Sequence, residues 1–191
     1  MIDVPALCAA LADARGDAIV VACQTARAPW HQASRRPELD VLFRGAMGKG
    51  SSLGLGLALA RPERRVVVLD GDGSLLMSLG SLASIADCRP PNLVLFLLEN
   101  GQYAGTGGQA IPGAGAVSFP AFARAARFPT VASFSALAPL RDALPGLLDA
   151  GGPSFIHCET DPVPGGEQVK DGLPTMPDTL ARLRQTLAGA L

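Results

Sequence analysis

Short apolar runs alternate along the chain with segments in which apolar residues recur at helical spacing. Apolar runs of strand length cover residues 18–23, 41–43, 66–69, 93–98, 131–134 and 154–158. Helical spacing covers residues 4–15, 75–86, 119–127, 137–149 and 179–187, and another helix rich in small residues is expected to end near residue 60. Strands without polar alternation are typical of a parallel sheet buried on both faces. The pattern therefore predicts a three-layer α/β/α fold with a mainly parallel, doubly wound sheet.

One domain is expected to account for residues 1–191, because this length supports one sizeable core and no internal repeat is visible. Residues 160–191 are predicted to form a C-terminal tail and helix, since a proline-rich stretch precedes the last helical segment. Two connections are expected to be loops. The first contains Pro29 and Pro37, and the second is the glycine-rich stretch 100–118.

Composition and charge narrow the classes of function. Hydrophobic residues make up 48% of the chain and charged residues 17%, the formal net charge is -1, and no run of like charges occurs. A nucleic acid or an anionic membrane would require a basic surface that this balance does not supply. Apolar runs also stay shorter than the roughly 18 residues that a membrane span requires. We therefore expect neither nucleic acid nor membrane as a partner.

The cysteines bear on compartment and metal chemistry. They are widely separated, at Cys8, Cys23, Cys88 and Cys158. This spacing fits neither a zinc or iron–sulfur site nor the disulfide framework of a secreted domain. Asp3 stands where a secretory signal would carry a basic residue. We expect a soluble, cytoplasmic protein.

Three glycine-rich segments follow three of the predicted strands. They are residues 44–52, 71–74 and 100–109. In open parallel sheets, ligands gather at the carboxyl ends of the strands, where such segments converge. Glycines there allow backbone groups to approach a bound phosphate closely. The sequence therefore predicts a ligand site at this edge of the sheet.

Asp72 and Asn100 are the most informative pair of side chains in these segments. They follow successive predicted strands and are separated by 28 residues. A carboxylate and an amide oxygen suit magnesium, which is usually shared between one or two protein side chains and phosphate oxygens. The backbone amides of Gly73 and Ser74, with the Ser74 hydroxyl, can meet a diphosphate at the start of the next helix. An isolated Gly-Asp-Gly would be an ordinary turn, but its position between a strand and a helix favours a site.

The stretch 44–109 resembles the cofactor domain of thiamine-diphosphate enzymes. The motifs that carry the resemblance are residues 45–48 (GAMG), 71–77 (GDGSLLM) and 100–109 (NGQYAGTGGQ). More closely, they are similar to the sulfopyruvate decarboxylase β subunit and the phosphonopyruvate decarboxylases. The resemblance implies thiamine diphosphate and Mg²⁺ as cofactors and decarboxylation of a short 2-oxoacid as the activity, with sulfopyruvate favoured over phosphonopyruvate.

The same resemblance implies roles for individual residues. Magnesium would be bound by Asp72, Asn100 and the backbone carbonyl of Gln102. The wider cofactor site would comprise Thr25, Ala46, Met47, Gly71, Asp72, Gly73, Ser74, Asn100, Gln102 and Tyr103. Thr25 is the weaker member of this set, because the neighbouring residues 27–31 (RAPWH) do not match the pattern expected near a diphosphate.

Three residues are expected to act on the reacting groups. Met47 corresponds to the apolar residue that holds the cofactor in its bent shape, and the alternative is that it fills a gap in the core. Thr106 and Gln109 lie in the loop expected over the thiazolium ring. They either hydrogen-bond a substrate carboxylate or sulfonate, or only support the loop.

Other polar residues receive structural interpretations. Glu99 is expected to face solvent or to brace the loop, without a ligand role. His31 is expected to be partly exposed and His157 to be a satisfied histidine within the sheet. Arg124 and Arg127 suit a sulfonate or phosphonate, but arginines on a helix usually form a solvated face.

A nucleotide P-loop is excluded at Lys49. Phe43 occupies the position where the motif requires its first glycine, and Gly50 stands where serine or threonine is needed.

The family resemblance also implies a partner. Its chemistry needs a glutamate that activates the aminopyrimidine ring, and this glutamate belongs to a separate pyrimidine-binding domain. We therefore expect this chain to be the β subunit of a hetero-oligomer whose α subunit carries that glutamate. Two alternatives remain: a β-like subunit of a 2-oxoacid:ferredoxin oxidoreductase, disfavoured by the missing cysteine cluster, and a non-catalytic cofactor-binding partner subunit.

Overall fold

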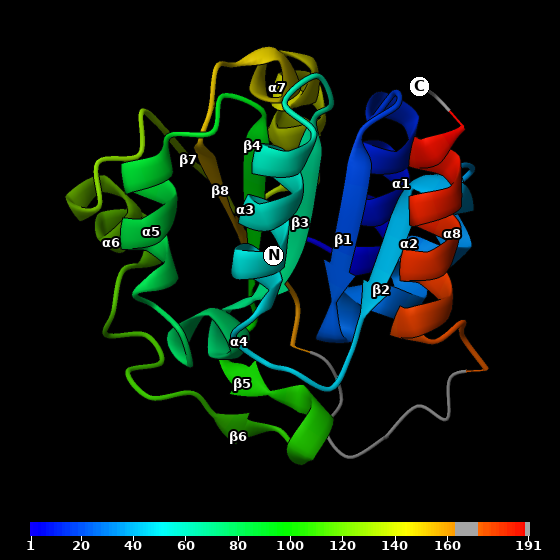
Figure 1. Ribbon diagram of the computed structural model, residues 1–191. Coiled ribbons are helices and arrows are strands. Elements are labelled where there is room, and N and C mark those ends of the chain that lie inside the picture. Colours follow the sequence, from blue (N-terminus) through cyan, green and yellow to red (C-terminus); the bar gives the residue numbers. More distant parts are fainter. Residues whose placement is uncertain (163–171, 190–191) are drawn as a thin grey trace.

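The fold is built on a six-stranded parallel sheet, shown in Figure 1, with strand order β2-β1-β3-β4-β8-β7. The computed structural model describes residues 1–162 and 172–189. The strands are β1 (Ile19–Cys23), β2 (Asp40–Phe43), β3 (Val66–Gly71), β4 (Leu93–Glu99), β7 (Thr130–Phe134) and β8 (Ser154–Glu159). Each pair of neighbours in this sheet is parallel. The predicted parallel sheet is therefore confirmed.

Helices cover both faces of the sheet (Figure 1). One face carries α1 (Val4–Ala14), α2 (Arg27–Ala33) and α7 (Leu137–Asp149). The other carries α3 (Gly50–Ala60), α5 (Ser81–Cys88), α6 (Phe119–Ala125) and α8 (Met176–Ala188). The shorter elements are α4 (Asp72–Leu76), the strands β5 (Gln102–Tyr103) and β6 (Gln109–Ala110), and the 3-10 turns η1 (Gln24–Ala26), η2 (Pro37–Leu39) and η3 (Ala104–Thr106). These layers confirm the three-layer α/β/α prediction.

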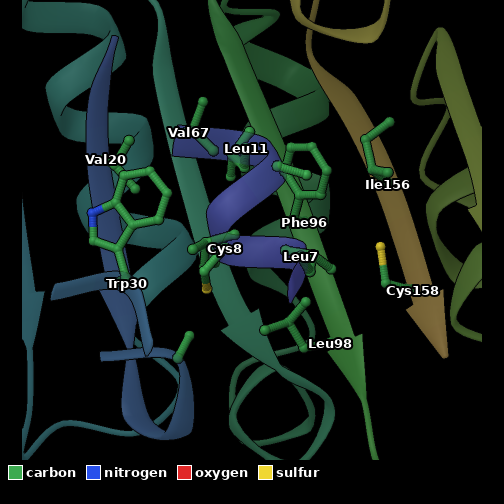
Figure 2. Close-up of a cluster of buried hydrophobic side chains, with 14 of the residues drawn as sticks. Leu7, Cys8, Leu11, Val20, Trp30, Val67, Phe96, Leu98, Ile156 and Cys158 are labelled. Atoms are coloured by element: carbon green, nitrogen blue, oxygen red, sulfur yellow. The ribbon is translucent and has the colours of Figure 1, made fainter. Parts of the chain in front are cut away.

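Alternate side chains of each central strand enter two separate cores. In β4, Phe96 and Leu98 pack into the core under α1, which Figure 2 shows, while Leu95 and Leu97 pack into the core under α3 and α5. All four are at most 3% exposed. Burial of one such side chain contributes roughly 1.5–3 kcal/mol. The central strands are apolar at almost every position because both faces are covered.

The connection after β1 differs from the predicted loop. It forms η1 and α2, and Pro29 stands in the first turn of α2. Proline is tolerated there because the first backbone N–H groups of a helix have no intrahelical acceptor. The presence of proline was therefore a poor reason to predict a loop.

Two further segments depart from the prediction. Residues 75–86 are not one helix: α4 ends at Leu76 and α5 begins at Ser81, with Ser78 and Gly80 between them. Serine and glycine are weak helix formers, which favours the break. The predicted loop 100–118 contains the two-stranded antiparallel hairpin β5–β6 around η3.

At the C-terminus, α8 begins three residues earlier than predicted, at Met176. Thr175 and Asp178 form a capping box that starts the helix. Part of the predicted tail, residues 163–171, lies outside the described residues. Among the helices of the described chain, none combines the length and apolar character needed to cross a bilayer.

A buried ion pair joins the elements at the amino end of the sheet. Arg15 is the C-cap residue of α1, and its guanidinium lies 2.5 Å from Asp40 Oδ1, at the start of β2. It also donates to the backbone carbonyls of Ala18 and Leu39 and lies over the Trp30 ring. Burial lowers the pKa of Arg15, and Asp40 opposes that shift. We refer to Arg15 and Asp40 below as the closed pair.

Candidate functional site

A cavity of about 230 Å³ opens at the carboxyl edge of the sheet. From β1 the chain crosses to β2 on one side, whereas β3 lies on the other side of β1. Such a switch point leaves a crevice between strand ends, where ligands bind in open α/β folds. The cavity is lined by Gln24, Thr25, Arg27, Arg44, Met47, Gly71, Asp72, Gly73, Ser74, Asn100, Gln102, Tyr103, Ala104, Gly105 and Thr106.

Most of the predicted site residues line this one cavity. They come from the ends of β1, β2, β3 and β4 and from the β5–β6 hairpin. Two predicted residues do not line it: Ala46, which is half-buried beside Met47, and Gln109, which is exposed. The structure thus brings the three glycine-rich segments together, and the ligand roles of individual residues stay predictions.

Asp72 joins the ends of β3 and β4. Its Oδ2 accepts backbone N–H bonds from Asn100 (3.0 Å) and Gly101 (2.7 Å), and its Oδ1 accepts from Gly73 at 2.7 Å. An ionised carboxylate offers about four acceptor positions, so one position on Oδ1 remains for a metal. The Asn100 side-chain oxygen accepts the Gln102 N–H at 3.0 Å and likewise has a second lone pair. Both predicted metal ligands are held in place by the backbone.

Burial raises the pKa of the Asp72 carboxyl, while the N–H bonds from Gly101, Gly73 and Asn100 oppose the rise. The negative charge of nearby Glu99 adds to the increase. A divalent cation would favour the ionised form of Asp72 because opposite charges stabilise each other. The carboxylate is therefore electrostatically suited to a cation.

Ser74 connects the end of β3 to the segment that carries Met47. Its hydroxyl oxygen accepts the Gly48 N–H at 3.0 Å. Behind it, Asp70 is fully buried and accepts the Gly71 N–H at 3.0 Å. Burial raises the pKa of Asp70 to about 6, against the opposing effects of Ser74 and Gly71. The Ser74 hydroxyl therefore helps to shape the cavity wall.

Gly48 allows this wall to approach α4 closely. Its φ is +80°, and a Cβ there would lie 2.9 Å from Ser78 Oγ and 3.0 Å from Met77 Cβ. A side chain at this position would force the two segments apart. The close approach presents Met47, which is half-buried, to the cavity.

The β5–β6 hairpin covers the start of α4. A Cβ at Gly73 would lie 2.4 Å from the Tyr103 ring, so only glycine fits beneath it. Within the hairpin, the Thr106 hydroxyl donates to Gln109 Oε1 at 3.0 Å, and Gln109 Nε2 donates to the Thr106 carbonyl at 2.9 Å. Gln109 therefore supports the turn that places Thr106 at the cavity.

The remaining polar residues named from the sequence lie elsewhere. His157 is buried in β8, and its Nε2 lies 2.6 Å from Glu99 Oε2. Glu99, expected to face solvent or to brace the loop, instead links the end of β4 to β8. His31, Arg124 and Arg127 do not line the cavity. No group of three or more His, Cys, Asp or Glu side chains in the described residues could hold a metal.

Arg27 and Arg44 are cavity residues that the motif reasoning missed. Arg27 is only 6% exposed, whereas Arg44 is exposed at the rim. Neither belongs to a recognisable motif. The signal that could have found Arg27 is topological, because it follows β1 directly at the switch point.

This geometry defines a class of protein: an α/β domain with a ligand cavity at a switch point of the sheet. Comparison with known proteins identifies the family. Residues 21–158 match the family model described as "Thiamine pyrophosphate enzyme, C-terminal TPP binding domain". The chain belongs to this family, which confirms the resemblance seen in the motifs.

Individual relatives agree with this assignment. Phosphonopyruvate decarboxylase from Streptomyces hygroscopicus is 48% identical over 118 residues, which cover 62% of this chain and 29% of the relative. Sulfopyruvate decarboxylase subunit beta from Methanothermobacter thermautotrophicus is 62% identical over 65 residues, 34% of this chain and 35% of the relative. The chain therefore spans about a third of the length of these relatives.

A solved structure supports the fold. The thiamine diphosphate-dependent 4-hydroxybenzoylformate decarboxylase of Rhodococcus jostii RHA1 superposes with a TM-score of 0.67 at 22% identity. The superposition covers 85% of this chain and 33% of that chain. At this identity the likeness shows a shared fold alone.

Proposed function

We propose that this chain is the β subunit of a hetero-oligomeric, thiamine-diphosphate-dependent 2-oxoacid decarboxylase. The observation that carries the proposal is that Asp72, Asn100 and Gly73 converge in one cavity that Met47 also lines. Membership of the thiamine pyrophosphate enzyme family supports the cofactor. The names of the two decarboxylase relatives support the reaction and the subunit role.

The donor atoms fit a magnesium–diphosphate complex. Asp72 and Asn100 each keep an acceptor position, and the carbonyl of Gln102 is the third proposed ligand. Magnesium takes oxygen ligands and usually shares its coordination with phosphates, so few protein side chains are needed. The absence of a larger acidic cluster among the described residues is compatible with this arrangement.

The residues of this chain would bind and orient. Thr25, Gly71, Gly73 and Ser74 would hold the diphosphate at the strand ends. Met47, with Ala46 behind it and Tyr103 on the facing hairpin, would shape the space for the rings. Thiamine diphosphate, when bound, supplies the electron sink that decarboxylation of a 2-oxoacid requires.

Thr106 is the proposed substrate contact of this chain. Its hydroxyl is exposed at the cavity and is oriented by Gln109. We favour sulfopyruvate, converted to sulfoacetaldehyde and CO₂, with phosphonopyruvate or another short 2-oxoacid as the alternative. The relatives include enzymes named for each of these substrates, so sequence similarity to them does not decide between sulfopyruvate and phosphonopyruvate.

The partner is proposed to be an α subunit that carries a pyrimidine-binding domain and the activating glutamate. Residues 1–191 would then form one diphosphate- and magnesium-binding domain with a C-terminal tail and helix from residue 160. We also propose a cytoplasmic location, since Cys8, Cys23 and Cys158 are buried free thiols and Cys88 is an exposed one.

Reconstitution tests the proposal. The purified chain receives thiamine diphosphate, magnesium and sulfopyruvate, with and without the candidate α subunit, and aldehyde release is followed. We expect activity only in the mixture. Turnover by the chain alone would contradict the division of labour, and an inactive complex that still binds the cofactor would favour a non-catalytic partner subunit.

The same assay distinguishes a decarboxylase from the oxidoreductase alternative. A 2-oxoacid:ferredoxin oxidoreductase would reduce an electron acceptor in the presence of coenzyme A, whereas a decarboxylase releases the aldehyde without an acceptor. The four cysteines show no cluster in the structure, which favours the decarboxylase.

A further inference from the structure

We propose that Arg27 is a direct cationic contact for a diphosphate in the cavity, on the wall opposite Asp72. This inference rests on the proposed function, because it assumes that a metal–diphosphate group binds there. It adds a residue that no motif in the sequence indicates.

Arg27 combines deep burial with access to the cavity. It is the first residue of α2, is 6% exposed, and lines the cavity together with Thr25 and Gly71. An arginine at a cavity wall can donate N–H bonds to the oxygens of a bound phosphate.

The backbone conformation before Arg27 places this residue at the cavity. Gln24, the residue directly after β1, has φ +46°, a conformation that residues other than glycine rarely adopt. Strained residues of this kind persist where the surrounding structure requires them and are concentrated at ligand sites. The turn at Gln24 ends β1 abruptly and places both Thr25 and Arg27 at the cavity.

Topology sets Arg27 and Asp72 on facing sides. β1 and β3 are adjacent parallel strands, with Ala22 level with Leu69. Arg27 follows the end of β1, and Asp72 follows the end of β3. The crevice between these ends therefore has a cation on one side and a carboxylate on the other. A magnesium–diphosphate complex has the matching polarity, with the metal toward Asp72 and phosphate oxygens toward Arg27.

Charge balance also requires a cation. A diphosphate ester carries more negative charge than one magnesium ion neutralises, and Asp72 adds a further negative charge. Arginine suits this task because its planar guanidinium can donate two parallel N–H bonds to a phosphate. Arg44 also lines the cavity but is exposed, so water screens its charge more strongly.

Calorimetry on the full chain tests the inference, with magnesium pyrophosphate and thiamine diphosphate as probes. We expect Arg27→Met to weaken binding of both by roughly 10- to 100-fold, the size of one lost charge-assisted hydrogen bond. Arg27→Lys should recover part of the affinity, since it keeps the charge and loses the fork. Arg124→Met, an exposed arginine outside the cavity, is the matched control and should bind like the parent.

A measurement on the parent protein avoids dependence on how well the variants fold. The Arg27 Nε–H signal, assigned by its loss in Arg27→Lys, should shift when magnesium pyrophosphate is added and not when thiamine is added. Equal affinities in parent and Arg27→Met, or an unchanged signal, would overturn the role of Arg27 alone. A parent chain that binds neither probe would instead overturn the proposed function of the cavity.

Discussion

Two buried arginine–aspartate combinations lie at opposite ends of the same sheet. At the amino end, Arg15 and Asp40 form the closed pair, 2.5 Å apart and at most 5% exposed. At the carboxyl end, Arg27 and Asp72 line the same cavity, and Asp72 accepts hydrogen bonds from three backbone amides. We call Arg27 and Asp72 the open pair.

The comparison shows how one arginine and one aspartate can stabilise the fold in one place and line a ligand cavity in another. In the closed pair, each charge is compensated within the protein and a cation–π contact with Trp30 adds to it. In the open pair, Asp72 accepts three backbone N–H bonds and keeps one acceptor position on Oδ1 for a cation. The closed pair should therefore matter for folding and the open pair for binding.

The largest expected effect comes from breaking the closed pair. Asp40→Ala leaves the Arg15 guanidinium buried without its anion, which should lower the free energy of unfolding by about 3–5 kcal/mol. Urea denaturation measures the change. Asp13→Ala is the control, because Asp13 pairs with Arg35 at the surface and should contribute less than about 1 kcal/mol. Similar losses in both variants would show that the closed pair has no special structural role.

In contrast to Asp40→Ala, Asp72→Asn should affect ligand binding more than stability. We expect magnesium-dependent binding of thiamine diphosphate to fall roughly 100-fold, or about 2.7 kcal/mol, because a charged metal ligand is lost. The free energy of unfolding should fall by about 1–2 kcal/mol, less than in Asp40→Ala, since the amide oxygen can replace Oδ2 but the amide nitrogen cannot accept the Gly73 N–H. Calorimetry with magnesium or EDTA, alongside urea denaturation, measures both. Exposed Asp149→Asn is the control, and a stability loss in Asp72→Asn as large as that in Asp40→Ala would contradict the comparison.

Met47→Ala tests whether Met47, which lines the same cavity as the open pair, acts on the bound cofactor. With the α subunit present, turnover should fall about 10-fold, equivalent to about 1.4 kcal/mol, because Met47 shapes the space for the rings. Cofactor affinity should change much less, since the diphosphate contacts are untouched. Met77→Ala is the control: Met77 is 54% exposed and does not line the cavity. Unchanged turnover in Met47→Ala would return Met47 to a packing role.

The smallest effect is expected from Ser74→Ala. The variant leaves the buried Gly48 N–H without its 3.0 Å acceptor, which should cost about 1 kcal/mol of unfolding free energy. Thermal or urea denaturation detects this. Ser84→Ala, on the exposed side of α5, should stay within about 0.5 kcal/mol of the parent. A Ser74→Ala variant as stable as Ser84→Ala would show that the bond to Gly48 is dispensable.

The sheet could be predicted because its strands carry their own signal. Each central strand is apolar at nearly every position, and helices such as α7 match their predicted bounds. The short elements could not be predicted in the same way. The β5 and β6 strands have two residues each, too few to show apolar periodicity, and Tyr103 of β5 packs over Gly73 of α4. Likewise, Ser78 and Met77, in the break between α4 and α5, lie close to Gly48, and this approach of distant segments is not visible in the local sequence.

The candidate site divides along the same line. Asp72, Asn100 and Met47 lie in compact motifs, so their presence at one strand edge followed from the sequence. Arg27 required the structure, because its importance comes from the turn at Gln24 and the position of β1 beside β3. In the local sequence, this turn lies beside a stretch that does not match the family pattern, and no feature there indicates a ligand contact.

The strand order also has a consequence for biosynthesis. β7 lies at the edge of the sheet and pairs only with β8, which is translated later. β1 to β4 can associate while the rest of the chain is still being made, since domains often begin to fold on the ribosome. β7 then stays unpaired, and one edge of β4 stays free, until β8 inserts between them. The half-exposed residues of β7, against the buried ones of β8, disfavour premature docking of β7 onto β4. Insertion of β8 is therefore the step that completes the sheet, and it can occur only after residues 154–159 have emerged from the ribosome.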